Sequence, residues 1–375
     1  MRFGLKLIFA SLFCFLILFL FKNNYSKFGH RQIDTIYGSF DANDSVILDL
    51  IDSDVIQRLK KVDQYGLSKG KSFSRYDHSI GVWALLKKFG APLEEQIAGL
   101  LHDASHTVFS HVGDKVFHHV EKAESYQDTI HEKYIGQTVV VDILKKYGIP
   151  FEVVDCKNKN YTMLEQDLPE VCTDRLEYNL RGGLVEGLIT LEEVTKILDS
   201  IRFENGKYFF TNIDLAKKFA EIPIYLSEHV WGSCDGFVAQ LFLAHALLRA
   251  VDLGLITVHD IHFSTDDVVS GILNGSNDEI IKKDMSSFFN SEDLYFVSSR
   301  QDHDKYFACK FRGVNPWVRL ENGEFKRLLD INNVCLHYYS CVKDKMKQGC
   351  YIKFTKDGHF LGDDFLTEVF FAGQG

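Results

Sequence analysis

The segment LLHDASHTVFSH, at residues 100–111, constrains this chain more than any other feature. It holds three histidines and one aspartate within twelve positions. The leucines beside these titratable side chains indicate that the side chains point inward. Buried imidazole and carboxylate groups need partners, and a divalent metal ion accepts imidazole nitrogen and carboxylate oxygen together. The segment therefore predicts a metal site inside the fold.

Helical apolar spacing surrounds this segment and dominates the chain up to about residue 286. The ranges with this spacing are 45–66, 75–90, 92–106, 131–147, 190–202 and 236–254. The last of these is apolar almost all round, but Gln240, His245 and Arg249 interrupt it. We therefore expect a buried core helix there rather than a membrane span.

Beyond residue 286 the pattern changes to alternating aromatic and β-branched residues. DLYFVSS, KYFACKFRG, PWVRLENGEFKRLL and GCYIKFT all have this character, and ENGE indicates a hairpin turn. The predicted fold is therefore mainly α, with a smaller α+β C-terminal part. The predicted domains are an N-terminal segment at 1–27, a helical domain at 28–285 and an α+β subdomain at 286–375.

The first 27 residues contain fifteen uninterrupted apolar or small residues, from Leu7 to Phe21, with positive charges on both sides. A signal peptide needs small residues at its cleavage site, and no A-x-A-like site stands before Lys27. A signal anchor needs roughly 17–25 apolar residues. We expect a membrane anchor made by this single segment, with an exported protein as the alternative. The flanking charges nearly balance, so they do not predict which side of the membrane the domain faces.

Composition limits the partners and the redox chemistry. The 375 residues carry a net charge of −10 and no long basic run, so strong nucleic-acid binding is not expected. A small anionic substrate remains compatible if a metal ion and a few arginines neutralise it locally. Seven cysteines beyond Cys14 lack C-x-x-C spacing, which predicts free thiols. They are Cys156, Cys172, Cys234, Cys309, Cys335, Cys341 and Cys350.

The residues that could share one ion come from several helices. His102 and Asp103 are adjacent, so on a helix they project about 100° apart and can straddle one ion. The two further ligands are expected from RYDHSIGV and CTDRLEY, as His78 and Asp174.

More histidines near these ligands are candidates for acid–base work. His106 follows His102 by four residues and shares its face if the helix continues. His111 and Asp114 are three residues apart, and a carboxylate can set the tautomer and basicity of a histidine. These residues and His131 are the predicted catalytic groups.

Taken together, SRYDHSIGV, LLHDASHTVFSH, IHEK and DRLEYNLR resemble the motifs of the HD-domain metal phosphohydrolases. They are most similar to the branch that contains deoxynucleoside triphosphate triphosphohydrolases. IQRLKKVDQYGL and FRGVNPWVRLENGEFKRLLDIN also resemble segments of that branch. The similarity covers roughly residues 34–355. It implies a metal-dependent hydrolase of a phosphate ester, expected to be a nucleotide, and a homo-oligomer as a possible assembly.

The resemblance implies a role for each matching position. His78, His102, Asp103 and Asp174 match metal ligands for Mn, Fe, Mg, Co or Zn. The positions that match catalytic or phosphate-contacting residues are His106, His111, Asp114 and His131. Arg75 and Arg175 match residues that reach the substrate phosphate, a role that suits a guanidinium. Gln64 and Tyr178 match positions near the sugar.

The sequence departs from this branch where the resemblance places the nucleoside. An aspartate that it places at the sugar is Gly182 here, and Asp63 and Tyr65 replace a lysine and a leucine. Gly182 favours an alternative, an HD phosphodiesterase or a nucleotide monophosphatase. Two further alternatives are a nucleotide-binding regulatory protein without turnover and a scaffold in which the metal is structural. The intact His/Asp set argues against the regulatory protein, because a binder does not need an acid–base array.

Overall fold

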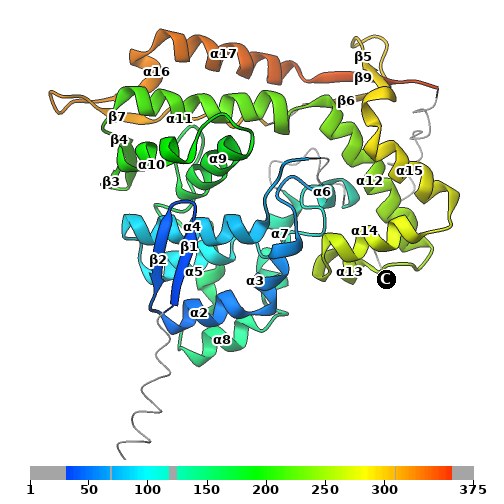
Figure 1. The fold of residues 1–375 in the computed structure, drawn as a ribbon, viewed down its shortest axis with the longest axis horizontal. Coiled ribbons are helices and arrows are strands. Elements are labelled where there is room, and N and C mark those ends of the chain that lie inside the picture. The colour runs from blue at the N-terminus through cyan, green and yellow to red at the C-terminus, as the bar shows by residue number, and fades with distance from the viewer. Residues whose placement is uncertain (1–30, 68–69, 118–124, 309, 357–375) are drawn as a thin grey trace, which may run out of the picture.

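The computed structural model describes residues 31–67, 70–117, 125–308 and 310–356, and the predicted N-terminal anchor lies outside these ranges. The described chain is mainly helical, as predicted (Figure 1). Its helices are α2 (Ser45–Asp52), α3 (Asp54–Arg58), α4 (Arg75–Phe89), α5 (Leu93–Leu101), α6 (Val112–Val116), α7 (Tyr126–Ile135), α8 (Val140–Lys146), α9 (Thr173–Val185), α10 (Leu191–Asp199), α11 (Ile213–Leu226), α12 (Cys234–Asp252), α13 (Val258–Phe263), α14 (Asp266–Gly275), α15 (Glu279–Phe289), α16 (Leu328–Ile331) and α17 (Asn333–Gln348).

Nine short strands form three small sheets in the described chain. β1 (Arg31–Thr35) and β2 (Gly38–Ala42) make an antiparallel hairpin. A second sheet has the order β3–β4–β7–β8, with bounds Ile201–Glu204, Lys207–Phe210, Trp317–Arg319 and Phe325–Arg327. The third has the order β5–β9–β6, with bounds Tyr295–Val297, Cys350–Phe354 and Lys305–Phe307. The predicted C-terminal strands are confirmed, and one of them, β7, pairs in parallel with β4 of the preceding helical part.

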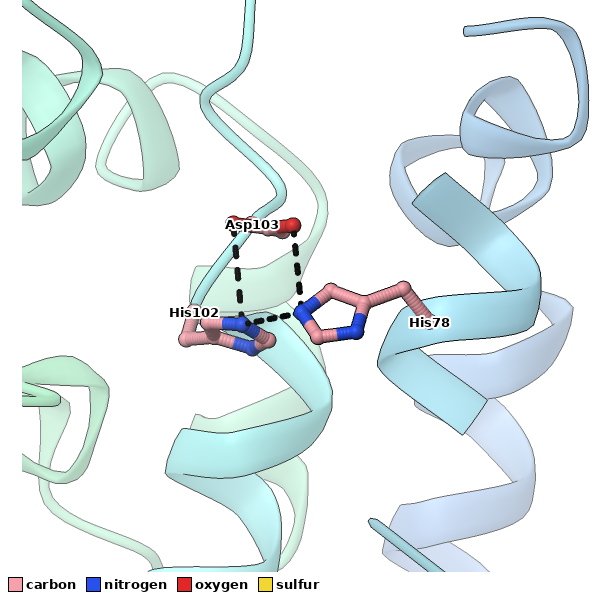
Figure 2. A group of neighbouring side chains, drawn as sticks. All are labelled: His78, His102 and Asp103. Atoms are coloured by element: carbon pink, nitrogen blue, oxygen red, sulfur yellow. Dashed lines mark hydrogen bonds and ion pairs between the residues drawn. The ribbon is translucent and has the colours of Figure 1, made fainter. Parts of the chain in front are cut away.

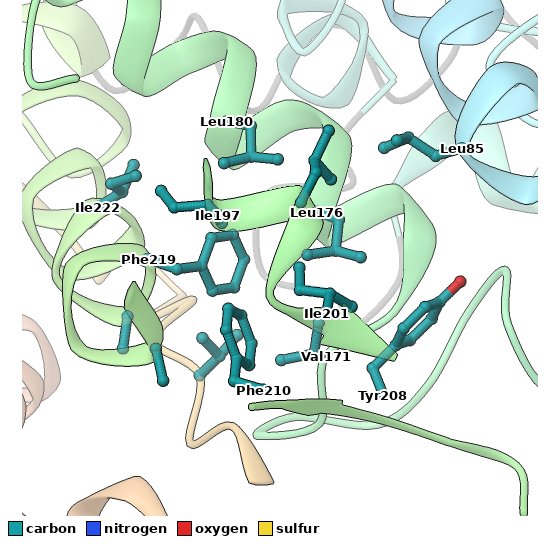
Figure 3. Packing of buried hydrophobic residues seen from close by; sticks show 14 of the residues in the cluster. Leu85, Val171, Leu176, Leu180, Ile197, Ile201, Tyr208, Phe210, Phe219 and Ile222 are labelled. Carbon is teal, nitrogen blue, oxygen red and sulfur yellow. The ribbon is translucent and has the colours of Figure 1, made fainter. Parts of the chain in front are cut away.

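The helix that carries His78, α4, runs through the middle of the fold. Ser74 and Asp77 form a capping box at its start, which satisfies the free backbone N–H groups of the first turn. Gly90 ends it in the left-handed conformation, with φ 82°. Its apolar side chains are buried in two hydrophobic clusters, one shared with α9 and α11 and one with α2 and α5. Figure 3 shows part of the first cluster, with Leu176 of α9 close to Phe210 and Phe219.

The region 190–210 differs from its prediction. The helix expected at 190–202 ends at Asp199, and β3 and β4 follow as a hairpin. Asn205 and Gly206 join the two strands with φ 52° and 74°, which is the geometry of a tight hairpin turn. The segment RFENGKYFF contains that Asn-Gly signal between aromatic residues.

Two further predictions concern α12. It is the one described helix long and apolar enough to cross a membrane, but half of its apolar window is buried. It packs in a hydrophobic cluster with α15, β6 and β9, which confirms a core helix.

The prediction of free thiols is wrong for Cys234 and Cys350, which form a disulfide although they are 116 residues apart in sequence. Spacing along the chain carries no signal for two cysteines that only the tertiary fold brings together.

Candidate metal centre

The donor atoms of His78, His102 and Asp103 all lie within 4.8 Å of one another (Figure 2). His78 comes from α4, and the other two residues directly follow α5. Asp174, in the first turn of α9, completes the group: its Oδ1 is 3.0 Å from Nε2 of His78 and 3.4 Å from Nε2 of His102. The four predicted ligands therefore converge on one buried position. Two imidazole nitrogens and two carboxylates are a fitting donor set for a divalent ion.

The turn after α5 differs from the prediction, because the helix ends at Leu101 and does not continue through His106. His102 Nδ1 lies 2.7 Å from the carbonyl oxygen of Gly99. That carbonyl would otherwise accept the helical hydrogen bond from Asp103. The same contact points Nε2 of His102 toward the donor group. His106 is therefore brought close by a turn rather than by a shared helix face.

Glu177 belongs to the centre, although the sequence did not predict it. It is fully buried, and its Oε2 accepts a 2.5 Å hydrogen bond from Nδ1 of His78. Its Oε1 accepts from Nε of Arg181 at 2.6 Å and from the Tyr37 hydroxyl at 3.0 Å. A carboxylate on the far nitrogen of a ligand histidine fixes the tautomer that presents the other nitrogen to the ion.

Two signals in the sequence could have located Glu177. It follows Asp174 by three residues, so both lie on one face of α9. Gly81 follows His78 by three residues, and a Cβ there would meet Oε1 of Glu177 at 2.2 Å. The glycine in HSIGV therefore leaves the space that the glutamate fills.

The charges around His78 fit a cation. Burial would lower the pKa of His78, but the negative charges of Glu177, Asp174 and Asp103 raise it to about 10. The site therefore favours a positive charge at His78. Because an imidazole ligand must be neutral, binding of a divalent ion would release that proton.

Arg75 lies in the centre but is engaged by the protein. It is 2% exposed, and its Nη1 donates to Oδ2 of Asp103 at 2.6 Å. Nε donates to the Ser110 hydroxyl, and Nη2 to the Gln64 carbonyl. Burial would raise the pKa of Asp103, but Arg75, His102 and His106 hold it well below its usual range. In the structure Arg75 thus orients a ligand, and its predicted phosphate contact stays a prediction.

The predicted acid–base residues fall into a buried and an open set. His106 is 3% exposed, and its Nε2 is 3.3 Å from Oδ1 of Asp103. Burial and the charge of Arg75 lower its pKa to about 3. His131, on α7, contacts the Ser105 hydroxyl at 2.9 Å. Burial and the charge of His102 lower its pKa to about 4, so both imidazoles are neutral at pH 7.

His111 and Asp114 form the open set. Nδ1 of His111 lies 3.0 Å from Oδ2 of Asp114, and the His111 side chain is 40% exposed. Its ring centroid is 5.2 Å from that of His106. Burial would raise the pKa of Asp114, but the hydrogen bond and charge of His111 hold it well below its usual range. The ionised carboxylate therefore keeps the proton on Nδ1, and Nε2 is the ring nitrogen that Asp114 does not engage.

The remaining predicted substrate contacts lie on two sides of the centre. Tyr178 is buried, with its ring centroid 6.4 Å from that of His78. Arg175 donates to the Glu170 carbonyl at 3.0 Å and lies 3.8 Å from Glu165. Oε1 of Gln64 is buried and accepts no hydrogen bond within the described ranges.

Tyr65 and Gly182, two positions where the sequence departs from the dNTP triphosphohydrolase pattern, lie next to each other in the fold. A Cβ added to Gly182 would meet the Tyr65 hydroxyl at 3.0 Å. That hydroxyl is buried and has no hydrogen-bond partner among the residues that the structure describes. Burial raises its pKa well above the usual range, so it stays protonated. A neutral hydroxyl thus stands beside the position where the resemblance expects a carboxylate.

Fold and site together define a metal-dependent hydrolase built on a helical core. The model of the HD domain family matches residues 75–201. The chain is 34% identical over 333 residues to the uncharacterised protein YdhJ of Bacillus subtilis, covering 86% of this chain and 98% of that protein. The chain belongs to the HD-domain family of metal-dependent phosphohydrolases.

Two more relatives carry functional names. The metal-dependent phosphohydrolase cns2 of Cordyceps militaris is 34% identical over 173 residues, which are 45% of this chain and 49% of that protein. The deoxynucleoside triphosphate triphosphohydrolase SAMHD1 of Danio rerio is 33% identical over 205 residues, which are 47% of this chain and 32% of that protein.

Proposed function

We propose that this enzyme hydrolyses deoxynucleoside triphosphates to a nucleoside and inorganic triphosphate. In that reaction water adds to the α-phosphorus, the bond from this phosphorus to the 5′ oxygen breaks, and the 5′ oxygen takes up a proton. A divalent ion at the four ligands supplies Lewis acidity, which activates water and polarises a phosphoryl oxygen. The likeness to the Danio rerio enzyme over 47% of the chain supports this substrate class.

The observation that carries the proposal is the open His111–Asp114 pair beside the buried ligands. A general acid must reach the leaving oxygen, and the His111 side chain is 40% exposed. The His131 ring is 4% exposed and already contacts Ser105. We therefore assign proton donation to Nε2 of His111, with Asp114 holding the tautomer. His106, neutral and against Asp103, is assigned to the proton path between His111 and the ligands.

Glu177 and Arg75 act on the reaction through the ligands that they hold, and Arg181 holds Glu177. Glu177 fixes the ring of His78, and Arg75 fixes the carboxylate of Asp103. Both are buried, so the ligand geometry is set before substrate arrives, which is what an electrostatic catalyst requires.

Product analysis tests the proposal. The full chain, purified without chelator, is incubated with Mn²⁺ and a panel of dNTPs, NTPs, monophosphates and cyclic dinucleotides. We expect nucleoside and triphosphate in equal amounts from dNTPs, and loss of both products in Asp103→Asn. His111→Gln should keep metal binding and lose turnover by about 10²–10⁴-fold, the contribution typical of a general acid. Pyrophosphate or orthophosphate as the first product would refute the proposal.

The Tyr65–Gly182 arrangement favours a second candidate, a phosphodiesterase or nucleotide monophosphatase on the same ligands. The carboxylate that the resemblance places at the sugar is missing, and a neutral phenol stands in that space. The same panel separates the candidates, because this one predicts monophosphates from cyclic dinucleotides, or nucleoside with orthophosphate from monophosphates.

Location and assembly remain proposals. We propose that residues 1–27 anchor the domain in a membrane and that the domain faces an oxidising compartment. The Cys234–Cys350 disulfide supports the second point, because such bonds persist mainly outside reducing compartments. Maleimide labelling of intact and permeabilised cells, with and without reductant, tests it. The homo-oligomer also stays a prediction, which light scattering would test. Limited proteolysis would test the predicted domain boundary at residue 286.

A further inference from the structure

The cations buried in the centre are already neutralised by protein groups. Arg75 is paired with Asp103 at 2.6 Å, and Arg181 is paired with Glu177 at 2.6 Å. Both guanidiniums are at least nine-tenths buried. A nucleoside triphosphate brings several negative charges beyond the phosphate at the reacting bond. Those charges need other cations near the site.

Arg312 and Lys310 supply such cations from a distant part of the chain. They lie in the segment that links β6 to β7, and Figure 1 shows these strands at opposite ends of the molecule, so the segment crosses the body. The backbone N–H of Arg312 donates to the Ser227 hydroxyl at 3.2 Å, which ties the segment to the end of α11. Within the described ranges, neither Arg312 nor Lys310 has a carboxylate at ion-pair distance.

A row of aromatic rings connects Arg312 to the metal ligands. Its guanidinium carbon is 5.9 Å from the ring centroid of Trp231. The rings of Trp231 and Tyr178 are 5.4 Å apart, and those of Tyr178 and His78 are 6.4 Å apart. Tyr178 is buried, whereas Trp231 and Arg312 are partly exposed, so the row leads from the ligands toward solvent.

The electrostatics also place these cations together with Arg175. Burial and the charges of Arg312 and Arg175 lower the pKa of Lys310, against the opposing charges of Glu165 and Asp128. Arg175 directly follows the ligand Asp174 in sequence. Arg175 has Glu165 at 3.8 Å, whereas Arg312 and Lys310 contribute two positive charges whose mutual repulsion is relieved when an anion binds.

We propose that Arg312 and Lys310, together with Arg175, form a polyphosphate-binding site on the solvent side of Tyr178. This inference rests on the proposed function and extends it: the site would hold the phosphates beyond the scissile bond. It would favour triphosphates over monophosphates as substrates. Arg312 contributes a planar guanidinium suited to two phosphate oxygens, and Lys310 contributes a point charge.

Binding of inorganic tripolyphosphate tests the site independently of turnover. Calorimetry on the full chain, with Mn²⁺ in excess, compares tripolyphosphate with orthophosphate. Arg312→Gln and Lys310→Gln should each weaken tripolyphosphate binding by about tenfold, the usual loss for one charge-assisted contact. Orthophosphate binding should stay unchanged. Arg312→Lys should retain most of the affinity. Arg319→Gln is the matched control, because Arg319, on β7, contacts Phe209 of β4 and Glu204 of β3 instead.

The outcomes separate this inference from the proposed function. Tripolyphosphate binding at wild-type strength in a folded Arg312→Gln variant would overturn the site, whatever the enzyme hydrolyses. If the wild-type enzyme does not cleave triphosphates but Arg312→Gln still weakens tripolyphosphate binding, the result supports the site and refutes the proposed reaction. If triphosphates are substrates, both Gln variants should raise KM for dNTPs and leave KM for a monophosphate ester unchanged.

Discussion

Glu177→Gln is the substitution whose effect the structure predicts in most detail. In the wild type, Oε1 of Glu177 accepts from Arg181 and Tyr37, and Oε2 accepts from Nδ1 of His78. A glutamine offers one oxygen, which the two donors Arg181 and Tyr37 would hold. Its amide nitrogen would then face His78. Nδ1 of the imidazole must then accept a hydrogen bond from that amide. The ring proton therefore moves to Nε2, the atom that faces the other ligands.

The magnitude follows from this change of tautomer. Loss of a partner that orients a ligand weakens metal affinity by about 10–100-fold, which is about 1.4–2.8 kcal/mol. The metal-free protein should also lose about 3 kcal/mol of unfolding free energy, because the Arg181 guanidinium is buried and would lack its counter-charge. Metal titration calorimetry and urea denaturation measure the two effects separately.

Glu95→Gln is the matched control. Glu95 is also buried, but its Oε1 accepts from the backbone N–H groups of Met163 and Leu164. A glutamine oxygen keeps both bonds, so metal affinity should not change. If Glu177→Gln binds Mn²⁺ as tightly as the wild type while Glu95→Gln behaves as expected, Glu177 does not set the His78 tautomer.

Three further predictions test other parts of the account. Reduction of the Cys234–Cys350 disulfide, or Cys234→Ser, should lower the unfolding free energy by about 5 kcal/mol, because the disulfide restricts the chain entropy of a loop of this length in the unfolded state. Urea denaturation with and without reductant measures this loss, and an unchanged denaturation midpoint would contradict it. Gly182→Ala should raise the unfolding free energy by about 1 kcal/mol more in a Tyr65→Phe background than in the wild type, because the added Cβ meets the Tyr65 hydroxyl at 3.0 Å. A double-mutant cycle in which the two effects simply add would exclude that contact. The pKa of Asp114 is held below its usual range, so its ionised form stabilises the fold above about pH 4, and that contribution disappears as the pH falls through the lowered pKa. The stability gap between wild type and Asp114→Asn should therefore narrow from pH 6 to pH 3, whereas a gap independent of pH would show that the carboxylate charge does not matter.

The sequence predicted the parts of the site that local patterns encode. His78, His102, Asp103 and Asp174 stand in ordered motifs, and the fold brings them to one position. Helix ends were less predictable, because the α5 helix stops where the His102 ring contacts the Gly99 carbonyl. That contact depends on a rotamer, which no apolar periodicity records.

Contacts between distant segments were beyond sequence reasoning. Tyr37 and Glu177 are 140 residues apart, and Arg312 reaches Trp231 across 81 positions. Neither pair has a spacing rule, since loops of any length can join the elements that carry them. Tyr65 and Gly182 were each visible as departures, but only the structure shows that one fills the space left by the other.

The most direct test of the four-ligand metal centre is to locate the ion. Crystals of the full chain grown with Mn²⁺ would be measured for anomalous scattering, and metal content in solution would be determined in parallel. We expect an anomalous peak bonded to Nε2 of His78 and His102 and to oxygens of Asp103 and Asp174, with the peak and the phosphohydrolase activity both lost in Asp174→Asn. An active protein whose only Mn²⁺ peak lies away from these four residues would contradict it.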